Sequence, residues 1–320
     1  MLLYSFLKIP ARFVLLLYCR HISISNKAAL ESDGPLLLAC NHPNSFLDAV
    51  IIATLFKRPV YSLTRGDAFA NKFTGKILAA LHMLPVYRIS EGAGFLEHNY
   101  KTFDDCMDIF RRNGIVLIFS EGLCVNEWHL RPLKKGTARL VLKAWDAGIP
   151  LQVLPVGINY SSFNRFGKNI QLNFGEKIKQ HDTGPSAIYG KKIAAINDLL
   201  NQQLQKLVVE IDDGNIAARK KYFFVQQPLI KKILLSVPAI SGWLLHLPIY
   251  FFLKKIITKS RVHPAHFDSM MMGGWVAIYP FYLLLIALVV FFLFGGWYWV
   301  AVFFLLPFFA WSYVQLKGQF

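Results

Sequence analysis

The sequence is short of cysteines and of recognisable catalytic motifs, and each shortage excludes a class of protein. Its four cysteines form no CxxC pair and no metal-ligand spacing, so we expect reduced, buried thiols. There is no HExxH motif, no glycine-rich phosphate or dinucleotide loop, and Ile118 stands where the first glycine of a GxSxG motif around Ser120 would be. We therefore expect no metal and no cofactor.

Acidic residues are also scarce. The chain has 19 aspartates and glutamates against 35 lysines and arginines, which gives a net charge of +16, and 54% of its residues are hydrophobic. A chain that is both basic and apolar suits a protein that works at an anionic membrane or on anionic substrates. Nucleic acid is the rival partner, but the apolar C-terminal runs and the lack of a nucleic-acid-binding motif argue against it.

Short apolar runs alternate with amphipathic segments from residue 34 to about 212, which predicts an α/β domain, a sheet flanked by helices, over residues 26–213. The expected strands are Leu36–Cys40, Val60–Leu63, Ile115–Phe119, Leu151–Val156 and Ile170–Phe174. The expected helices are Phe46–Phe56, Ala68–Leu81, Phe95–Phe110, Gly136–Ala147 and Ala187–Val209.

Apolar segments precede and follow this domain. Residues 1–25 mix apolar side chains with Lys8 and Arg12, which favours a helix lying in the membrane interface, with burial against the domain as the alternative. Residues 214–268 are basic. Their apolar run Ile233–Leu253 contains two prolines and a glycine, so we expect a kinked re-entrant or interfacial element rather than a clean span.

Residues 269–320 contain two apolar runs, Trp275–Phe294 and Trp297–Leu316, each about the length that crosses a bilayer. Only two glycines separate them. Lys259 and Arg261 precede the pair and Lys317 follows it, and cations favour the cytoplasmic side. We expect a transmembrane hairpin with the catalytic domain on the cytoplasmic face.

The best candidate for chemistry is the end of the strand Leu36–Cys40, where His42 is followed six residues later by Asp48. These side chains suit a general base and a carboxylate that orients it. Residues six apart in one ideal helix point about 240° apart. The two can therefore meet only if His42 lies in the turn and Asp48 in the helix, which Asn44 or Ser45 could cap. The alternative is a histidine at a turn and an aspartate on a solvated face.

Three more stretches at or near strand ends, Leu84–Arg88, Phe119–Gly122 and Leu154–Ile158, contain candidate binding residues. Ligands of open α/β sheets bind where strands end, so these stretches have a reason to converge. The cations that could bind a phosphate there are Arg88, Arg131, Lys134 and Lys135, although each could equally be a solvated surface residue. Among the other histidines, His129 is of interest because Glu121 is close in sequence.

Taken in order, Asn41-His42…Asp48, Val86-Tyr87-Arg88, Phe119-Ser120-Glu121-Gly122 and Leu154-Pro155-Val156 resemble the four motif blocks of the glycerol-phosphate and 1-acylglycerol-3-phosphate acyltransferase superfamily. The resemblance covers roughly residues 20–210. It implies that His42 is the general base and that Asp48 orients it. It also implies that Asn41, Arg88 and the Glu121-Gly122 block bind substrate, the latter two at the glycerol phosphate, and that the Pro155 block lines the acyl site.

The sequence departs from the family pattern in two places. Five residues separate His42 from Asp48 where four are usual, as in some glycerol-3-phosphate acyltransferase branches, and the turn at Pro43 could absorb the extra one. The third block usually reads F-P-E-G-T-R, but Leu123-Cys124 stand in place of its Thr-Arg. Either Arg131 or the Lys134-Lys135 pair replaces that arginine, or the acceptor has a different head group.

The resemblance thus implies transfer of an acyl group from acyl-CoA or acyl carrier protein to a hydroxyl of glycerol 3-phosphate or a lysophospholipid such as 1-acylglycerol 3-phosphate, in phospholipid biosynthesis. Two alternatives stay open. One is an O-acyltransferase that acts on a lyso-aminolipid or another non-phosphate acceptor. The other is a membrane lipid-binding protein that keeps the fold without the catalysis.

Overall fold

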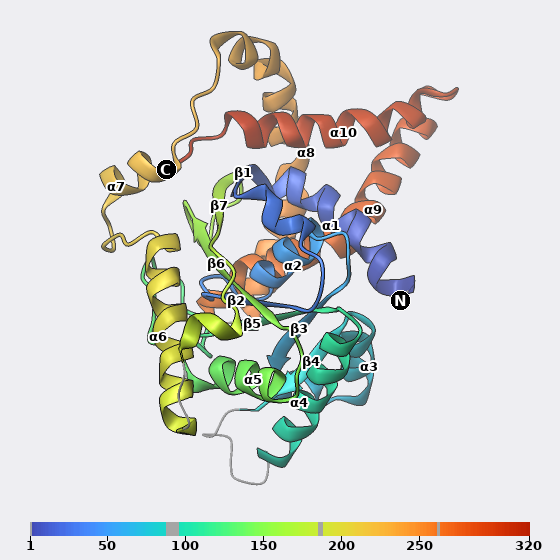
Figure 1. Cartoon of the computed structure of the whole chain (residues 1–320). Coiled ribbons are helices and arrows are strands. Elements are labelled where there is room, and N and C mark those ends of the chain that lie inside the picture. Colours follow the sequence, from blue (N-terminus) through green and yellow to red (C-terminus); the bar gives the residue numbers. More distant parts are fainter. Residues whose placement is uncertain (1, 88–95, 185–187, 261–262) are drawn as a thin grey trace.

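The computed structural model describes residues 2–87, 96–184, 188–260 and 263–320, and its centre is a seven-stranded sheet (Figure 1). The strand order is β1-β7-β6-β2-β5-β3-β4. All described neighbours are parallel except β6 and β7, which are antiparallel. The strands are β1 (Cys19–Ser25), β2 (Leu36–Cys40), β3 (Val60–Arg65), β4 (Met83–Val86), β5 (Ile115–Phe119), β6 (Gln152–Tyr160) and β7 (Lys168–Phe174).

Helices cover both faces of the sheet, which confirms the predicted α/β architecture. One face packs against α1 (Leu2–Tyr18) and α2 (Ser45–Leu55), and the other against α4 (Leu96–Arg111), α5 (Lys135–Asp146) and α6 (Tyr189–Leu207). Because strand side chains alternate, Leu36, Leu38 and Cys40 of β2 face the first layer, whereas Leu37 and Ala39 face the second. All five β2 side chains are buried, which explains the unbroken apolar run.

The sequence analysis missed two edge strands. The N-terminal helix ends at Tyr18, and the chain continues as β1, which pairs in parallel with β7. At the opposite edge β4 pairs with β3, and α3 (Lys72–Ala80) precedes it. On α1, Val14, Leu15 and Tyr18 are buried against the domain. Other apolar side chains of α1, among them Phe6 and Ile9, are exposed, so this helix has an apolar surface on its outer side as well.

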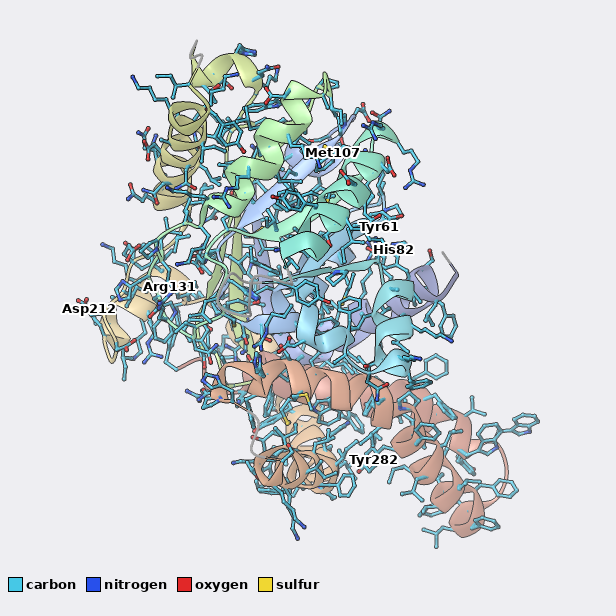
Figure 2. All side chains as sticks on the ribbon, turned by 90° about the horizontal axis from the view of Figure 1, so that it is seen from below. Tyr61, His82, Met107, Arg131, Asp212 and Tyr282 are labelled. Atoms are coloured by element: carbon cyan, nitrogen blue, oxygen red, sulfur yellow. The ribbon has the colours of Figure 1, made fainter. Side chains whose placement is uncertain are left out.

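The C-terminal region is helical: α7 (Ile216–Phe223), α8 (Leu229–Lys259), α9 (Phe267–Phe294) and α10 (Tyr298–Leu316). By length and composition α8, the segment Pro264–Phe294 containing α9, and α10 could each cross a membrane. Figure 2 shows these helices on the opposite side of the molecule from α4, with Tyr282 among the former and Met107 on the latter.

The helix α8 is continuous through both of its prolines, Pro238 and Pro248. Its glycine has a packing function. A Cβ on Gly242 would lie 2.0 Å from the carbonyl oxygen of Phe309, so glycine lets α8 approach the backbone of α10. The pair α9 and α10 matches the two expected runs, although α9 begins at Phe267, well before Trp275. Gly295 and Gly296 join these helices with positive φ values of 63° and 57°.

Candidate active site

His42 and Asp48 meet at the carboxyl end of the central strand. His42 lies in the turn after β2, Asp48 lies in the first turn of α2, and His42 Nδ1 is 2.9 Å from Asp48 Oδ2. Asp48 is fully buried, and it also accepts the N–H of Asn44 at 2.8 Å and the hydroxyl of Tyr160 at 2.6 Å. A carboxylate on Nδ1 selects the tautomer in which Nδ1 donates and Nε2 is free to accept a proton.

The ring of His42 is held in a partly open position. It stacks on Phe119 at the end of β5, with ring centroids 3.7 Å apart and an interplanar angle of 12°, and 18% of its side chain is exposed. A base at this place is oriented by a buried carboxylate on one side and reachable by substrate on the other. The arrangement can accept a proton from a bound hydroxyl.

The five-residue interval closes through an unusual turn. Ser45 has a positive φ of 53°, in the left-handed region that most side chains avoid. The expected capping of α2 by Asn44 or Ser45 is wrong, because neither side chain bonds a first-turn N–H of this helix. Both instead contact residues of the C-terminal segment. The side-chain amide of Asn44 donates to Asp268, and the hydroxyl of Ser45 lies beside Nδ1 of His266.

Glu121 bonds the turn that joins His42 to Asp48, which is called the catalytic turn below. This carboxylate is 4% exposed and accepts the backbone N–H of His42 at 2.9 Å and that of Arg131 at 3.0 Å. Burial raises the pKa of Glu121 to about 7, and the two N–H donors oppose that rise. Gly122 follows with φ +67°, a conformation that favours glycine in the turn after β5.

The cationic residues that the sequence singled out lie near this turn. Arg131 is half-buried and pairs with Glu127 at 2.7 Å (its position is labelled in Figure 2), whereas Lys134 and Lys135 are exposed at the start of α5. Arg88 lies outside the described residues. His129 pairs with Glu210 at 2.6 Å rather than with Glu121, and this bond raises the pKa of His129.

Two other residues of the motif blocks are buried in the framework. The side-chain amide of Asn41 is 3% exposed and pairs with the backbone of Ile158, accepting its N–H at 2.7 Å and donating to its carbonyl at 3.1 Å. It thereby ties the end of β2 to β6. Pro155 is buried and pairs with Ala39 of β2, whose side chain faces the layer that contains α6. His42 lies on the other face, so Pro155 does not line the groove described next.

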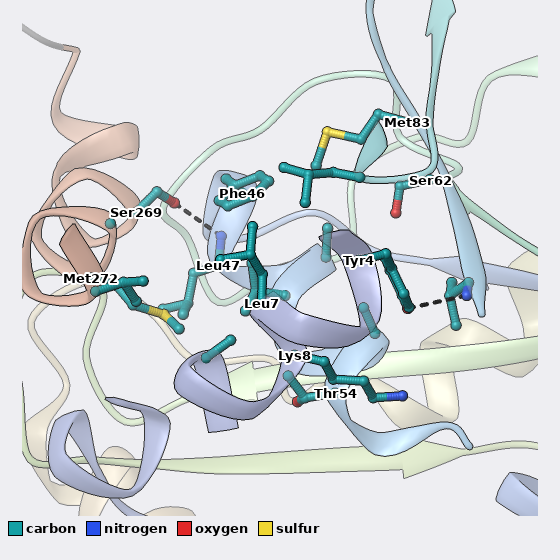
Figure 3. A pocket seen from close by; sticks show the side chains of 18 residues that line it. Tyr4, Leu7, Lys8, Phe46, Leu47, Thr54, Ser62, Met83, Ser269 and Met272 are labelled. Atoms are coloured by element: carbon teal, nitrogen blue, oxygen red, sulfur yellow. Dashed lines mark hydrogen bonds between the residues drawn. The ribbon is translucent and has the colours of Figure 1, made fainter. Parts of the chain in front are cut away.

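An apolar groove of about 200 Å³ begins beside the catalytic turn (Figure 3). Its walls are residues 4–11 of α1, 46–54 of α2, 60–83 around β3 and β4, and 269–276 of α9. Phe46 and Leu47 are among its lining residues and directly precede Asp48 in the chain. The walls come from four distant parts of the chain, so no local pattern could have revealed this groove. Among the described residues, no cluster of three or more His, Cys, Asp or Glu side chains could hold a metal ion.

Comparison with known proteins finds similar sequences and a similar fold. Residues 21–159 match the family model Acyltransferase. The chain is 24% identical over 194 residues to the 1-acyl-sn-glycerol-3-phosphate acyltransferase of Bacillus subtilis (strain 168), a match that covers 60% of this chain and 90% of that protein. Among solved structures it is similar to the 1-acyl-sn-glycerophosphate (LPA) acyltransferase PlsC from Thermotoga maritima, with a TM-score of 0.41 and 10% identity over 64% of this chain and 79% of that one.

The family match and the Bacillus subtilis relative indicate an acyltransferase, and its C-terminal region contains three helices that could cross a membrane. Residues 21–159 match the Acyltransferase family, and the chain is similar over 194 residues to a 1-acyl-sn-glycerol-3-phosphate acyltransferase.

Proposed function

We propose that the protein is a membrane-bound O-acyltransferase of phospholipid biosynthesis, with His42 as its general base. Its acceptor would be a hydroxyl of glycerol 3-phosphate or of 1-acylglycerol 3-phosphate, and its donor an acyl thioester of coenzyme A or acyl carrier protein. The observation that carries the proposal is the 2.9 Å bond from His42 to the buried carboxylate of Asp48, inside the residues that match the family.

The chemistry needs no covalent enzyme intermediate. Nε2 of His42 takes the proton of the acceptor hydroxyl as its oxygen attacks the thioester carbonyl. Asp48 holds the imidazole and stabilises the imidazolium that forms. The tetrahedral intermediate then collapses to the ester and expels the thiolate, which takes the proton back from His42. A positioned base supplies about 10²–10⁴-fold, and much of the remainder comes from orienting two bound amphiphiles.

The apolar groove beside Phe46 and Leu47 supports an acyl chain as part of the substrate. A chain running along α2 from Phe46 to Thr54 would be buried over about 12 Å, at about 1.5 Å per residue of helix. In this proposal the acyl chain lies in the groove, whereas the resemblance assigned the acyl site to the block around Pro155.

For the acceptor phosphate, the exposed Lys134 and Lys135 are the better-placed cations, because Arg131 is engaged by Glu127. The pairing of Arg131 with Glu127 and the presence of Leu123-Cys124 in place of the usual Thr-Arg both leave fewer cations for a phosphate. They favour a second candidate acceptor, a lyso-aminolipid. The non-catalytic alternative fits less well, because a lipid-binding protein has no need of a partly exposed histidine oriented by a buried carboxylate.

A cytoplasmic catalytic domain is supported by contacts at both ends of the α9–α10 pair. At one end Asp268 bonds Lys168 of β7, and at the other the Lys317 ammonium donates to the carbonyl of Phe166 at 2.8 Å. Two ends that touch the same domain belong on the same side of a membrane, and the cations beside them favour the cytoplasmic side.

The test is product identification by mass spectrometry, with purified full-length protein given mixed acceptors and donors. We expect the wild type to form an acylated glycerol phosphate and His42→Ala to lose at least about 10²-fold in turnover. His181→Ala, at a largely exposed histidine, is the matched control and should keep full activity. Near-wild-type turnover in His42→Ala would exclude this base, and a product made only from the lyso-aminolipid would select the second acceptor.

A further inference from the structure

The turn between His42 and Asp48 is held by residues more than 200 positions further along the chain. Ser269, in the first turn of α9, accepts the backbone N–H of Leu47 at 3.0 Å, and its hydroxyl lies 3.3 Å from the carbonyl oxygen of Asn44 (Figure 3 shows the first bond). The hydroxyl of Ser45 lies 2.6 Å from Nδ1 of His266. These bonds involve Asn44, Ser45 and Leu47, three of the five residues that lie between His42 and Asp48.

A buried ion pair fixes this part of α9 to the sheet. Asp268 and Lys168 of β7 are both fully buried and bond each other. Asp268 also accepts the hydroxyl of Tyr18 at 2.6 Å and the side-chain amide of Asn44 at 2.8 Å. The carboxylate therefore joins α1, β7 and the catalytic turn at one point. Since burying two charges requires good pairing, this arrangement fixes where α9 begins.

The turn between His42 and Asp48 is strained and takes part of its hydrogen bonding from outside. Ser45 occupies the left-handed region, a strained conformation for a residue other than glycine. Neither Asn44 nor Ser45 caps α2, and Ser269 satisfies the first-turn N–H of Leu47 instead. The N–H of Asn44 donates to Asp48 Oδ2, the same oxygen that bonds His42. A displacement of this turn therefore moves the carboxylate relative to the imidazole.

We infer that the start of the apolar helix α9, through Asp268 and Ser269 of its first turn and His266 immediately before it, is a positioning element for the His42–Asp48 pair. The inference rests on the proposed function for its kinetic consequence. None of the three residues lies in the segment 21–159 that matches the family, so an intact family match is not sufficient for an ordered catalytic turn. The membrane-associated region completes the active site as well as attaching it to a bilayer.

Ser269→Ala is the informative substitution, because removing Asp268 would leave Lys168 as an unpaired buried charge and threaten folding. We expect kcat to fall roughly 3- to 10-fold, the loss of one or two hydrogen bonds, with the KM values of donor and acceptor unchanged. Ser269→Thr keeps the hydroxyl and should restore most of the rate. Ser236→Ala is the matched control, because Ser236 is exposed on α8 and its hydroxyl donates to the carbonyl of Ile233 in its own helix.

A second measurement does not depend on activity. Cys124 Sγ accepts the N–H of Ser45 at 2.9 Å, and it is the one partly exposed thiol, since Cys19, Cys40 and Cys106 are buried. Burial raises the pKa of the Cys124 thiol to about 12, so alkylation should be slow in the wild type. We expect N-ethylmaleimide, with the site mapped by mass spectrometry, to modify Cys124 several-fold faster in Ser269→Ala than in the wild type or Ser236→Ala.

Unchanged alkylation and an unchanged kcat in Ser269→Ala would overturn the inference. A fall in kcat that Ser269→Thr fails to restore, accompanied by a lower melting temperature, would overturn it too, because the serine would then serve stability alone. If the wild type forms no acylated product, the proposed function fails, whereas the alkylation rates still decide whether α9 holds the turn.

Discussion

Replacing Asp48 with asparagine separates two contributions of this carboxylate, the orientation of the imidazole and its negative charge. The backbone N–H of Asn44 points at Oδ2, so the oxygen of the new amide should occupy that position and its NH₂ should face Tyr160. In this orientation the amide oxygen still accepts the hydrogen on His42 Nδ1. The tautomer survives, and only the charge that stabilises the imidazolium is lost.

The magnitude follows from that difference. A hydrogen bond to a charged group contributes about 1.5–3 kcal/mol and a neutral one about 0.5–1.5 kcal/mol. The difference, about 1–1.5 kcal/mol, means that Asp48→Asn should lower kcat by about 5- to 12-fold, at about 1.4 kcal/mol for each factor of ten. Asp48→Ala removes the orientation as well and should lose more, towards the full 10²–10⁴-fold of a positioned base.

The assay is the release of free thiol from an acyl-CoA donor, followed spectroscopically at saturating acceptor, with melting temperatures as the control for folding. The expected order of kcat is wild type, then Asp48→Asn, then Asp48→Ala. Turnover near that of the wild type in a folded Asp48→Ala would refute the orienting role of the carboxylate. An Asp48→Asn variant as inactive as Asp48→Ala would refute the amide orientation deduced from the N–H of Asn44.

Two further predictions concern the carboxylate under the turn and the groove beside it. Burial raises the pKa of Glu121 from 4.5 to about 7, so the folded state binds this proton more tightly than the unfolded chain does. Protonated Glu121 therefore stabilises the fold fully below pH 4.5, and this stabilisation is lost as the pH rises to about 7. Between pH 8 and pH 5 the wild type should thus gain about 2–3 kcal/mol of stability relative to Glu121→Gln, and denaturant titrations that show equal pH dependence would contradict this. In the groove, Ala53→Phe should raise KM about fourfold for each CH₂ group that the new ring displaces, at about 0.8 kcal/mol per CH₂. Donors of increasing chain length measure this effect, and an unchanged chain-length preference would remove the groove from the acyl site.

Much of the α/β domain could be predicted because its signals are local. The fully apolar run of β2 and the 3.6-residue periodicity of α5 and α6 are properties of neighbouring residues, and both were placed within a few positions. The edge strands were missed for the same reason. In β1 the segment Cys19–Ser25 alternates only weakly, and its strand conformation comes from pairing with β7, which lies almost 150 residues away.

Local rules failed where packing overrode them. The two prolines and Gly242 in α8 predicted a kinked re-entrant or interfacial element. The structure contains one continuous helix there, in which the glycine admits the backbone of α10. His129 lies close to Glu121 in sequence, yet it bonds Glu210 after the intervening segment folds back. Sequence proximity was therefore a poor guide to the partner of a polar side chain.

The sequence by itself determined that His42 and Asp48 could act together, since the strand-to-helix change between them leaves one geometry in which they meet. Only the tertiary structure decided what makes that geometry stable. The turn is strained at Ser45, and the side chains of Asn44 and Ser45 and the N–H of Leu47 bond Asp268, His266 and Ser269. Its shape therefore depends on these three residues as well as on Glu121 and Cys124. Hydrogen bonds of this kind join groups brought together by folding, and no periodicity or spacing along the chain encodes them.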